Sequence, residues 1–394
     1  MRRVVGVAAM LVLAACTSTE TVTSTSLAPL VPPDALPIDT AAPVTSVATS
    51  SLPDAPIIVA LPEPTCEFAA APLDGGEITF ISGDLLWGAT PNGSSVRCLG
   101  TLSRGQRGLV QWSPNGQRAL LNGSSVLDVD GVRGSGFDPG SPRTRWEFPD
   151  GAGLVATSTT GRTVVRRDAT NASARTQVEF ISRTTALAMH PHGDAIVVGG
   201  KDADITGVYA SPESDGGPSR TLLTLSSPDA SISDVAVDAA GDTVYAIVDS
   251  PNATEVGVLS ALDLSYRSLV TEQAPIAQLT VGPVWRTLAW RTGLCNSTTT
   301  TWLRDDRTST AVQIGTGTPL QPLSVSPIGW LDANRLVVAS RSIGCDGLAD
   351  IWIWNISDGA ATLLVKSVEF PATRTVNEPA GPLAITPGAV PPVV

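Results

Sequence analysis

Short apolar stretches separated by tight-turn residues dominate the middle of the chain. In residues 109–121, the apolar Leu-Val-Gln-Trp is followed by Ser-Pro-Asn-Gly and then, after Gln-Arg, by Ala-Leu-Leu. This order predicts a strand, a tight turn and a second strand. Residues 350–364 carry Asp-Ile-Trp-Ile-Trp, an Asp-Gly turn and a second apolar run, which predicts a hairpin. The pattern therefore predicts a protein built from short antiparallel strands.

The strand-turn-strand unit recurs along the chain. Related turns begin at Pro72, Pro114, Pro149, Pro191, Asp238, Pro283 and Pro327. Spacings near 40–45 residues, with several short strands per unit, are typical of β-propellers. We therefore predict an all-β fold, a β-propeller of four-stranded blades. The seven recurring turns predict seven blades. Six blades are the alternative, because the unit at Pro283 is degenerate.

The Trp-Ser-Pro-Asn-Gly unit and the Asp-Ile-Trp-Ile-Trp hairpin resemble the WD40-like repeats of TolB-type propellers. The resemblance covers residues 66–370 and is strongest in these two units. The N-terminal α/β domain of TolB has no counterpart, because a Thr/Ser/Pro-rich stretch occupies that place. The resemblance implies the propeller fold and does not transfer TolB's own role.

The first residues have the features of an export signal. Arg2 and Arg3 precede an apolar run over residues 4–13, which is too short to span a membrane. Leu-Ala-Ala-Cys then resembles the bacterial lipobox, in which Cys16 would receive a diacylglycerol. We predict a lipoprotein signal peptide over residues 1–15 and an extracytoplasmic protein anchored by lipid to the bacterial cell membrane. The alternative is an ordinary secretory signal with a chance cysteine.

Composition sets the limits of the folded domain. Residues 16–62, rich in Thr, Ser, Pro and Ala, predict the lipidated cysteine and a disordered linker. We expect the propeller over residues 63–370 and a disordered Pro-rich tail over 371–394. The 36 Gly and 31 Pro disfavour a helical bundle.

The charge of the chain restricts its partners. The net charge is −12 and becomes −14 without the signal, which contains two arginines and no acid. An acidic surface excludes binding to nucleic acid through phosphates. It also disfavours contact with anionic lipid headgroups, so we expect membrane contact through the N-terminal lipid only.

Four cysteines remain after Cys16, in a compartment where disulfides persist. Three pairings are open in principle. Cys66 precedes the first blade and Cys98 lies in its outermost strand, so we predict that these two pair. Cys295 and Cys345 follow the second strands of neighbouring units, so we predict a second bridge between their loops.

No catalytic constellation stands out. The chain has two histidines and no Gly-x-Ser-x-Gly elbow, which argues against a serine hydrolase. His190 and His192 flank Pro191 where other units have turns, and we interpret both as structural. Asp128 with Asp130 fits a hairpin turn, whereas Asp202 with Asp204 suggests a calcium site in a longer loop.

The two ends of the predicted blades differ. Turns joining first to second and third to fourth strands are tight, whereas the second-to-third connections at 199–207, 249–255, 292–301 and 341–350 look long and polar. Rigid scaffolds commonly carry binding residues on such loops. We predict a recognition surface here with these contact residues: Lys201, Asp202, Asp204, Asp249, Glu255, Arg341 and Asp346.

The sequence thus favours a monomeric binding or scaffold module for an envelope protein or a glycan, with no cofactor and no evident catalysis. The first alternative is a calcium-dependent, lactonase-like propeller enzyme with Asp, Glu and Asn in the central channel. The second is a sensor that captures a small solute.

Overall fold

The computed structural model describes a large part of the chain between residues 65 and 385. The described residues are 65–69, 73, 77–108, 110–113, 115–137, 144–146, 151–157, 162–179, 181–190, 195–212, 220–238, 240–282, 287–293, 299–305, 310–321, 323–341, 348–369, 384 and 385. All of them belong to one compact unit, Pro53–Val394. The predicted signal peptide and linker, with Cys16, lie outside this set, as do Cys295, Cys345 and Asp346.

Seven four-stranded antiparallel sheets make up the described structure. Blade 1 contains β1 (Ile78–Ser82), β2 (Leu85–Ala89), β3 (Val96–Thr101) and β28 (Ala384–Ile385). Blade 2 contains β4 (Val110–Trp112), β5 (Ala119–Leu121), β6 (Ser125–Asp128) and β7 (Gly131–Gly134). Blade 3 contains β8 (Thr144–Trp146), β9 (Gly153–Thr157), β10 (Thr163–Asp168) and β11 (Ala174–Glu179). Blade 4 contains β12 (Arg183–Met189), β13 (Ala195–Asp202), β14 (Ile205–Pro212) and β15 (Arg220–Thr224).

The remaining blades follow in chain order. Blade 5 contains β16 (Ser231–Val237), β17 (Thr243–Ser250), β18 (Ala253–Ser260) and β19 (Tyr266–Glu272). Blade 6 contains β20 (Ile276–Val281), β21 (Thr287–Thr292), β22 (Thr300–Asp305) and β23 (Val312–Gln313). Blade 7 contains β24 (Ser324–Trp330), β25 (Arg335–Arg341), β26 (Leu348–Asn355) and β27 (Ala361–Glu369). A 3-10 turn, η1 (Arg104–Gln106), is the only helical element of the described residues.

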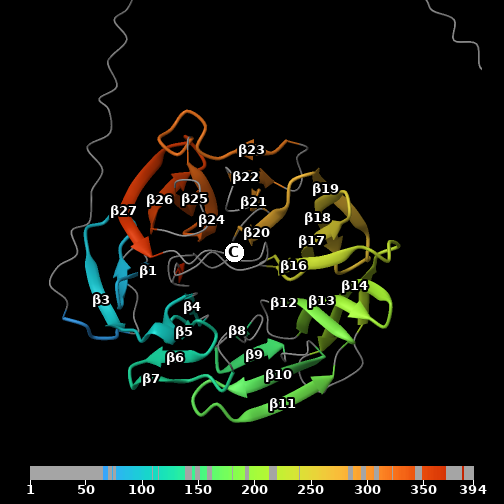
Figure 1. Ribbon diagram of the computed structural model, residues 1–394, viewed down its shortest axis with the longest axis horizontal. Coiled ribbons are helices and arrows are strands. Elements are labelled where there is room, and N and C mark those ends of the chain that lie inside the picture. Colours follow the sequence, from blue (N-terminus) through green and yellow to red (C-terminus); the bar gives the residue numbers. More distant parts are fainter. Residues whose placement is uncertain are drawn as a thin grey trace, which may run out of the picture. The chain divides into compact units, whose positions relative to one another are not determined.

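The seven sheets form a ring, with the strands β4, β8, β12, β16, β20 and β24 nearest its centre (Figure 1). The prediction of a seven-bladed β-propeller is confirmed, and the degenerate unit at Pro283 is a full blade.

Alternation of side chains along each second strand explains how the blades stack. In β17, Val244, Ala246 and Val248 are buried against blade 4. Tyr245 and Ile247, between them in sequence, are buried against blade 6. Successive side chains of a strand point to opposite faces, so a continuous apolar run supplies two cores at once. Such a run is what a strand buried on both faces requires.

The predicted turns join first to second strands with a shared geometry. In blade 2, the Gly116 nitrogen donates to the Ser113 carbonyl at 2.8 Å, and Gly116 has a φ of 71°. In blade 5, the Gly241 nitrogen donates to the Asp238 carbonyl at 3.0 Å, with a φ of 82°. Glycine adopts this left-handed conformation without steric cost. Units that differ in sequence therefore form the same turn.

Blade 7 differs from the predicted repeat. Pro327, where its turn was expected, lies inside β24 at a register shift between Pro327 and Gly329. The turn follows at residues 331–334, where the Leu331 nitrogen donates to the Arg335 carbonyl at 2.9 Å. Proline is tolerated in strands at bulges, where it removes no ladder bond. In blade 7, proline therefore marks a bulge inside β24, and the turn to β25 begins only after this strand has ended.

Both ends of the propeller meet in blade 1. Ala384 and Ile385 form β28, which pairs with β1 at Thr79 and Ile78. This strand takes the place that the first strand holds in every other blade. The two residues depart from the expectation of a disordered tail over 371–394. Their pairing closes the ring with the C-terminal segment as the innermost strand.

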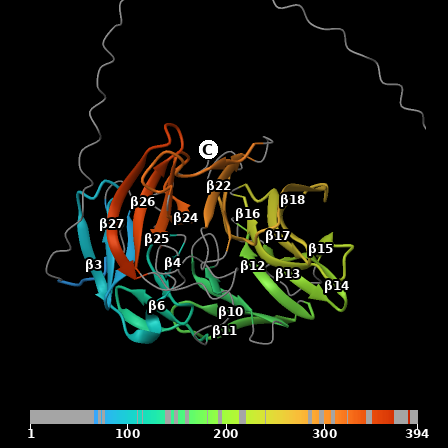
Figure 2. The ribbon, with the colours of Figure 1, turned by 45° about the horizontal axis from the view of Figure 1, so that its top comes forward.

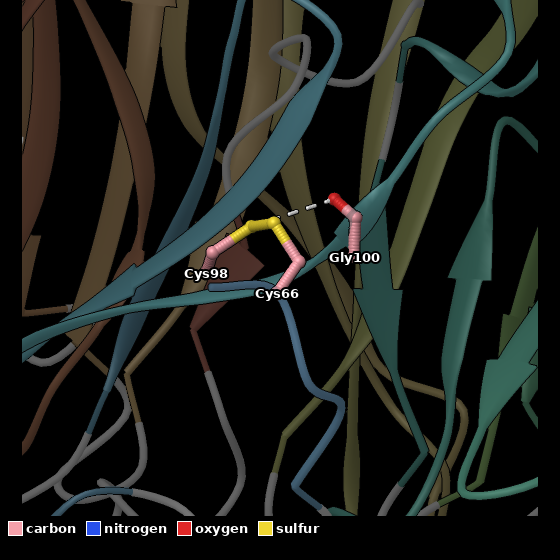
Figure 3. Close-up of a disulfide and its surroundings, with 3 residues drawn as sticks. All are labelled: Cys66, Cys98 and Gly100. Carbon is pink, nitrogen blue, oxygen red and sulfur yellow. Dashed lines mark hydrogen bonds between the residues drawn. A yellow bond between two sulfur atoms is a disulfide. The ribbon is translucent and has the colours of Figure 1, made fainter. Parts of the chain in front are cut away.

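The predicted disulfide between Cys66 and Cys98 is present, with 4.5 Å between the Cα atoms (Figure 3). Cys98 lies in β3, the outermost strand of blade 1, as expected. Next to it, Arg97 donates to both carboxylate oxygens of the fully buried Glu77, at 2.8 and 2.5 Å. Any Cβ at Gly88 would overlap this carboxylate, so the glycine makes room for the ion pair. The disulfide therefore fixes residues 65–69 to β3, the outermost strand of blade 1.

Candidate functional site

The second-to-third connections of blades 4 and 5 are short hairpins. Strands β13 and β14 pair from Ala195 to Asp202 and leave only residues 203 and 204 in the turn. Strands β17 and β18 leave only residues 251 and 252. The expectation of long loops at 199–207 and 249–255 was therefore wrong.

Close packing explains the glycines in the segment that was expected to form a loop in blade 4. A Cβ at Gly200 would overlap the carbonyl of Arg183 on β12, and one at Gly207 would overlap the carbonyl of Leu223 on β15. Glycine inside a strand often marks such a close approach of two backbones. We call this end of the propeller the hairpin end.

Lys201 and Asp202 are held at the hairpin end of blade 4. The Lys201 ammonium donates to the carbonyl of Pro228, in the connection from blade 4 to blade 5, at 3.2 Å. The hydroxyl of Ser182 donates to Asp202 at 3.3 Å and accepts from the Ala203 nitrogen at 2.8 Å. Asp204 is exposed in the turn. Lys201 therefore fixes the connection that forms one wall of the cavity described next.

Blades 4 and 5 (Figure 2) border a cavity of about 380 Å³ at the hairpin end. We call it the blade 4–5 cavity. Blade 4 and its connection contribute Leu223, Thr224, Leu225, Ser226, Ser227 and Ala230. Blade 5 contributes Val248, Ser250, Ala253, Glu255, Tyr266 and Thr271. Of the seven predicted contact residues, Glu255 lies in this cavity and Lys201 binds its wall.

Glu255 and Tyr266 form a pair inside the cavity. The Tyr266 hydroxyl donates to Oε1 of Glu255. Burial raises the pKa of Tyr266 above its ordinary value, and the hydrogen bond to Glu255 and the charge of that carboxylate raise it further. The phenol therefore stays protonated near neutral pH and remains a donor.

A glycine positions the tyrosine. A Cβ at Gly257 on β18 would overlap the ring and hydroxyl of Tyr266, so the ring lies directly over Gly257. Sequence reasoning missed Tyr266. The signal was present in Val-Gly-Val-Leu of β18, because a lone glycine inside an apolar strand indicates close approach by another group.

Asp249 is near the cavity but faces elsewhere. Its Oδ1 accepts from the hydroxyl of Thr254 at 3.1 Å, across the β17–β18 hairpin. The neighbouring Ser250 hydroxyl donates to the Ala253 carbonyl at 2.7 Å. These bonds close the hairpin tip of blade 5 and keep its turn short.

Arg341 lies away from this cavity, at the end of the second strand of blade 7. It ends β25, whose residues 336–340 are all buried, and is itself only 7% exposed. On β21, Arg291 is 1% exposed and donates to the Ser326 hydroxyl at 3.4 Å. Burial and the nearby Arg341 lower the pKa of Arg291 to about 10. The expected exposed contact at Arg341 is thus a buried cation, because the strand extends further than expected.

The other candidate groups have structural contacts. Asp128 ends β6 before a two-residue turn and pairs with Arg133 at 2.5 Å, which fits the expected hairpin. The His190 ring contacts the carbonyl of Gly241 in blade 5 at 3.2 Å. The described residues contain no group of three or more His, Cys, Asp or Glu side chains placed to hold a metal ion. None of them forms a helix with the length and hydropathy needed to cross a bilayer.

Comparison with known proteins finds similarity in structure but not in sequence. No protein-family model matches the chain. No curated protein matches it either. TolB from Acinetobacter baumannii is similar in structure, with a TM-score of 0.45 and 12% identity, over 79% of this chain and 66% of that one. A puromycin-hydrolysing peptidase from Mycobacterium tuberculosis has a TM-score of 0.51 and 15% identity, over 77% of this chain and 56% of that one.

These similarities define a class and no activity. Dipeptidyl peptidase 4 from Porphyromonas gingivalis has a TM-score of 0.49 and 11% identity, over 77% of this chain and 53% of that one. The chain thus spans about half the length of either peptidase. It is a β-propeller protein with TolB among its structural neighbours. Folds of this kind carry many functions, so the function has to be argued from the site.

Proposed function

We propose that this protein is a lipid-anchored, extracytoplasmic propeller that binds an envelope protein or a glycan through the hairpin end of blades 4 and 5. The observation that carries the proposal is the blade 4–5 cavity, which contains Glu255 and whose wall Lys201 fixes. A well-formed pocket with a few convergent polar groups is the default binding site in an uncharacterised fold. The lipobox at Cys16 and the linker after it support the location.

The cavity is suited to binding because its floor and rim differ. Its floor is apolar, with Val248 only 5% exposed. Its rim carries exposed hydroxyls from both blades, Ser226 and Thr271 among them. Glu255 and its hydrogen-bond partner Tyr266 lie on neighbouring strands, so the site needs little ordering when a partner binds.

Site-specific photo-cross-linking in the native envelope tests the binding face. A photoreactive residue replaces Ser226 on the cavity rim in one variant. In the matched control it replaces Ser357, an equally exposed serine in the β26–β27 turn at the opposite end. We expect one recurrent partner captured from position 226 and none from position 357. Capture from position 357 alone would place binding at the other end.

Fatty-acid labelling tests the anchor independently. In the unchanged protein we expect incorporation of an alkyne fatty acid and recovery with membranes. The Cys16→Ser variant should lose the label and leave the membrane fraction. A variant that still carries the label would show that Cys16 is not the lipidated residue.

A further inference from the structure

We infer that the blade 4–5 cavity binds a neutral, polyhydroxylated ligand, a sugar ring of a glycan. The inference rests on the proposed function and chooses between its two classes of partner. It draws on the size of the cavity, the distribution of its polar groups and its charge.

The volume of the cavity favours a single sugar ring over the surface of a folded protein as the ligand. The cavity measures about 380 Å³, at the lower end of the range of small-molecule sites, about 300–1,000 Å³. Specific protein–protein interfaces instead bury about 800 Å² on each partner. A single ring of a longer chain matches the cavity better than a folded partner does.

The polar groups match a ligand that carries many hydroxyls. Five serine and threonine hydroxyls border the cavity, in addition to the phenol of Tyr266: Thr224, Ser226, Ser227, Ser250 and Thr271. Each hydroxyl both donates and accepts hydrogen bonds, whereas the Glu255 carboxylate only accepts. Tyr266 occupies Oε1 of that carboxylate, which orients the group. A ligand O–H group that meets this carboxylate would form a charge-assisted hydrogen bond, the stronger kind.

The floor matches the other face of such a ligand. Leu223, Leu225, Ala230, Val248 and Ala253 give an apolar base, and the half-buried Tyr266 ring stands beside it. A sugar ring presents C–H groups on its faces and hydroxyls around its edge. It would bury the C–H groups on this base while its hydroxyls reach the rim.

The charge of the site disfavours an anion. Among the described residues that line the cavity, Glu255 is the one acidic side chain, and none is a lysine or an arginine. Lys201, one of the predicted contact residues, does not line the cavity, and its ammonium donates to the carbonyl of Pro228. A phosphate, sulfate or carboxylate ligand would meet a like charge with no compensating donor charge. A small amine remains the competing ligand, and the test includes it.

Saturation-transfer NMR and calorimetry on the propeller-containing chain test the inference. The probes are a panel of neutral mono- and disaccharides, with n-propylamine and methyl phosphate as the charged alternatives. The variants are Glu255→Gln and the cavity-filling Ala253→Trp. The matched control is Ala360→Trp, at an exposed alanine in the β26–β27 turn. Thermal melting of each variant confirms that it folds.

We expect binding of at least one neutral saccharide, lost in Ala253→Trp and unchanged in Ala360→Trp. In Glu255→Gln the affinity should fall about tenfold, since an amide still accepts a hydrogen bond but without charge. Binding of propylamine that Glu255→Gln abolishes, with no saccharide bound, would overturn the sugar assignment and leave a binding site in place. Binding of methyl phosphate would overturn the charge argument.

The cross-linking experiment separates this inference from the proposed function. If no saccharide binds but position 226 captures a protein, the inference fails and the binding function stands. If no saccharide binds and position 226 captures nothing, both fail. A saccharide that binds equally to Ala253→Trp lies elsewhere on the protein, which also overturns the inference.

Discussion

The junction of blades 4 and 5 and the junction of blades 6 and 7 are both formed by two four-stranded sheets, but the side chains between the sheets differ. Between blades 6 and 7, Trp330, Trp352 and Trp354 are buried, with 5–8% of their surface exposed. Between blades 4 and 5 the buried residues are smaller, mostly Ala, Val and Leu. The first junction encloses the buried Arg291. The second borders a cavity that contains the carboxylate of Glu255.

The geometry of a ring explains why this difference matters. Blades diverge with distance from the centre, so the space between them widens toward the outer strands. On the third strand of blade 7, Trp352 and Trp354 face blade 6 and fill that space. The third strand of blade 5 has Glu255 and Gly257 on the face turned to blade 4. Protein interiors tolerate few voids, so side-chain size on the third strand decides whether a junction is packed or forms a site.

Removing a tryptophan from the packed junction should have the largest effect. Trp352→Ala deletes a buried ring and the bond from its Nε1 to the Ser340 hydroxyl at 2.8 Å. We expect a loss of about 3–5 kcal/mol in the free energy of unfolding. Leu225→Ala, on the floor of the cavity, should cost about 1 kcal/mol or less, because Leu225 is only half-buried. Denaturant unfolding measures the loss in free energy of unfolding for each variant. Equal losses would show that the two junctions do not differ in packing.

Arg291→Met should act in the opposite direction. A guanidinium that is 1% exposed beside a second arginine is costly to bury. Replacing it with an apolar side chain should raise the free energy of unfolding by about 1–3 kcal/mol at pH 7. Lys366→Met, at an exposed position, is the control and should change little. A marked loss of stability in Arg291→Met would show that an anion compensates the buried charge.

The same arginine predicts a pH dependence. The pKa of Arg291 is lowered to about 10, so the unfolded chain binds more protons than the native state from about pH 10 upward, until free arginine itself titrates. The contribution of this group to stability therefore rises with pH across that window. Subtracting the Arg291→Met profile from that of the unchanged protein isolates the slope. A falling difference would contradict the assignment.

Gly257→Ala tests how the cavity is built. Its Cβ would overlap the Tyr266 ring, so the ring must move and its bond to Glu255 must break. We expect a loss of about 1–3 kcal/mol together with weaker binding at the cavity. Gly134→Ala, at another strand glycine with no positive φ but with open space around it, controls for backbone effects. A Gly257→Ala variant with unchanged binding would mean that Tyr266 does not shape the site.

Tyr266→Phe should have the smallest effect on stability. The variant loses one hydrogen bond to a half-buried carboxylate, worth about 1 kcal/mol. Because the pKa of Tyr266 is raised, the native state holds its proton above pH 10 after the unfolded chain has lost it. Stability from this group is therefore present below pH 10 and lost as pH rises. Tyr266→Phe should flatten that decline more than Tyr209→Phe does, as measured by unfolding between pH 9 and 11.

The sequence was sufficient for the features that depend on local chemistry. Turns such as Ser-Pro-Asn-Gly need a glycine at one position, so they identify the first hairpin of a blade even where the strands diverge. Cys66 and Cys98 could be paired because one blade brings its outermost strand beside the preceding segment. Pro327 misled because proline suits a bulge as well as a turn.

The sequence was insufficient where packing between distant strands decides the outcome. Residues 199–207 were expected to form a loop, whereas Gly199 and Gly200 belong to β13 and allow close approach to blade 5 and β12. The cavity depends on the relative size of side chains from two blades, which no single segment carries. Glu255 was predicted as a contact because it lies at the end of the expected loop 249–255. Its partner Tyr266 lies one strand away, and only the three-dimensional register brings the two together.

The pairing of β28 with β1 also determines when the protein can finish folding. Blades 2 to 7 each come from one continuous stretch and have all their strands once residue 369 has been synthesised. Blade 1 waits for Ala384 and Ile385, which are added some 300 residues after its other three strands. A chain that stops early would keep an open sheet edge, which invites pairing with other chains. Closure of the ring therefore has to wait until Ala384 and Ile385 have left the ribosome, however early the other blades form.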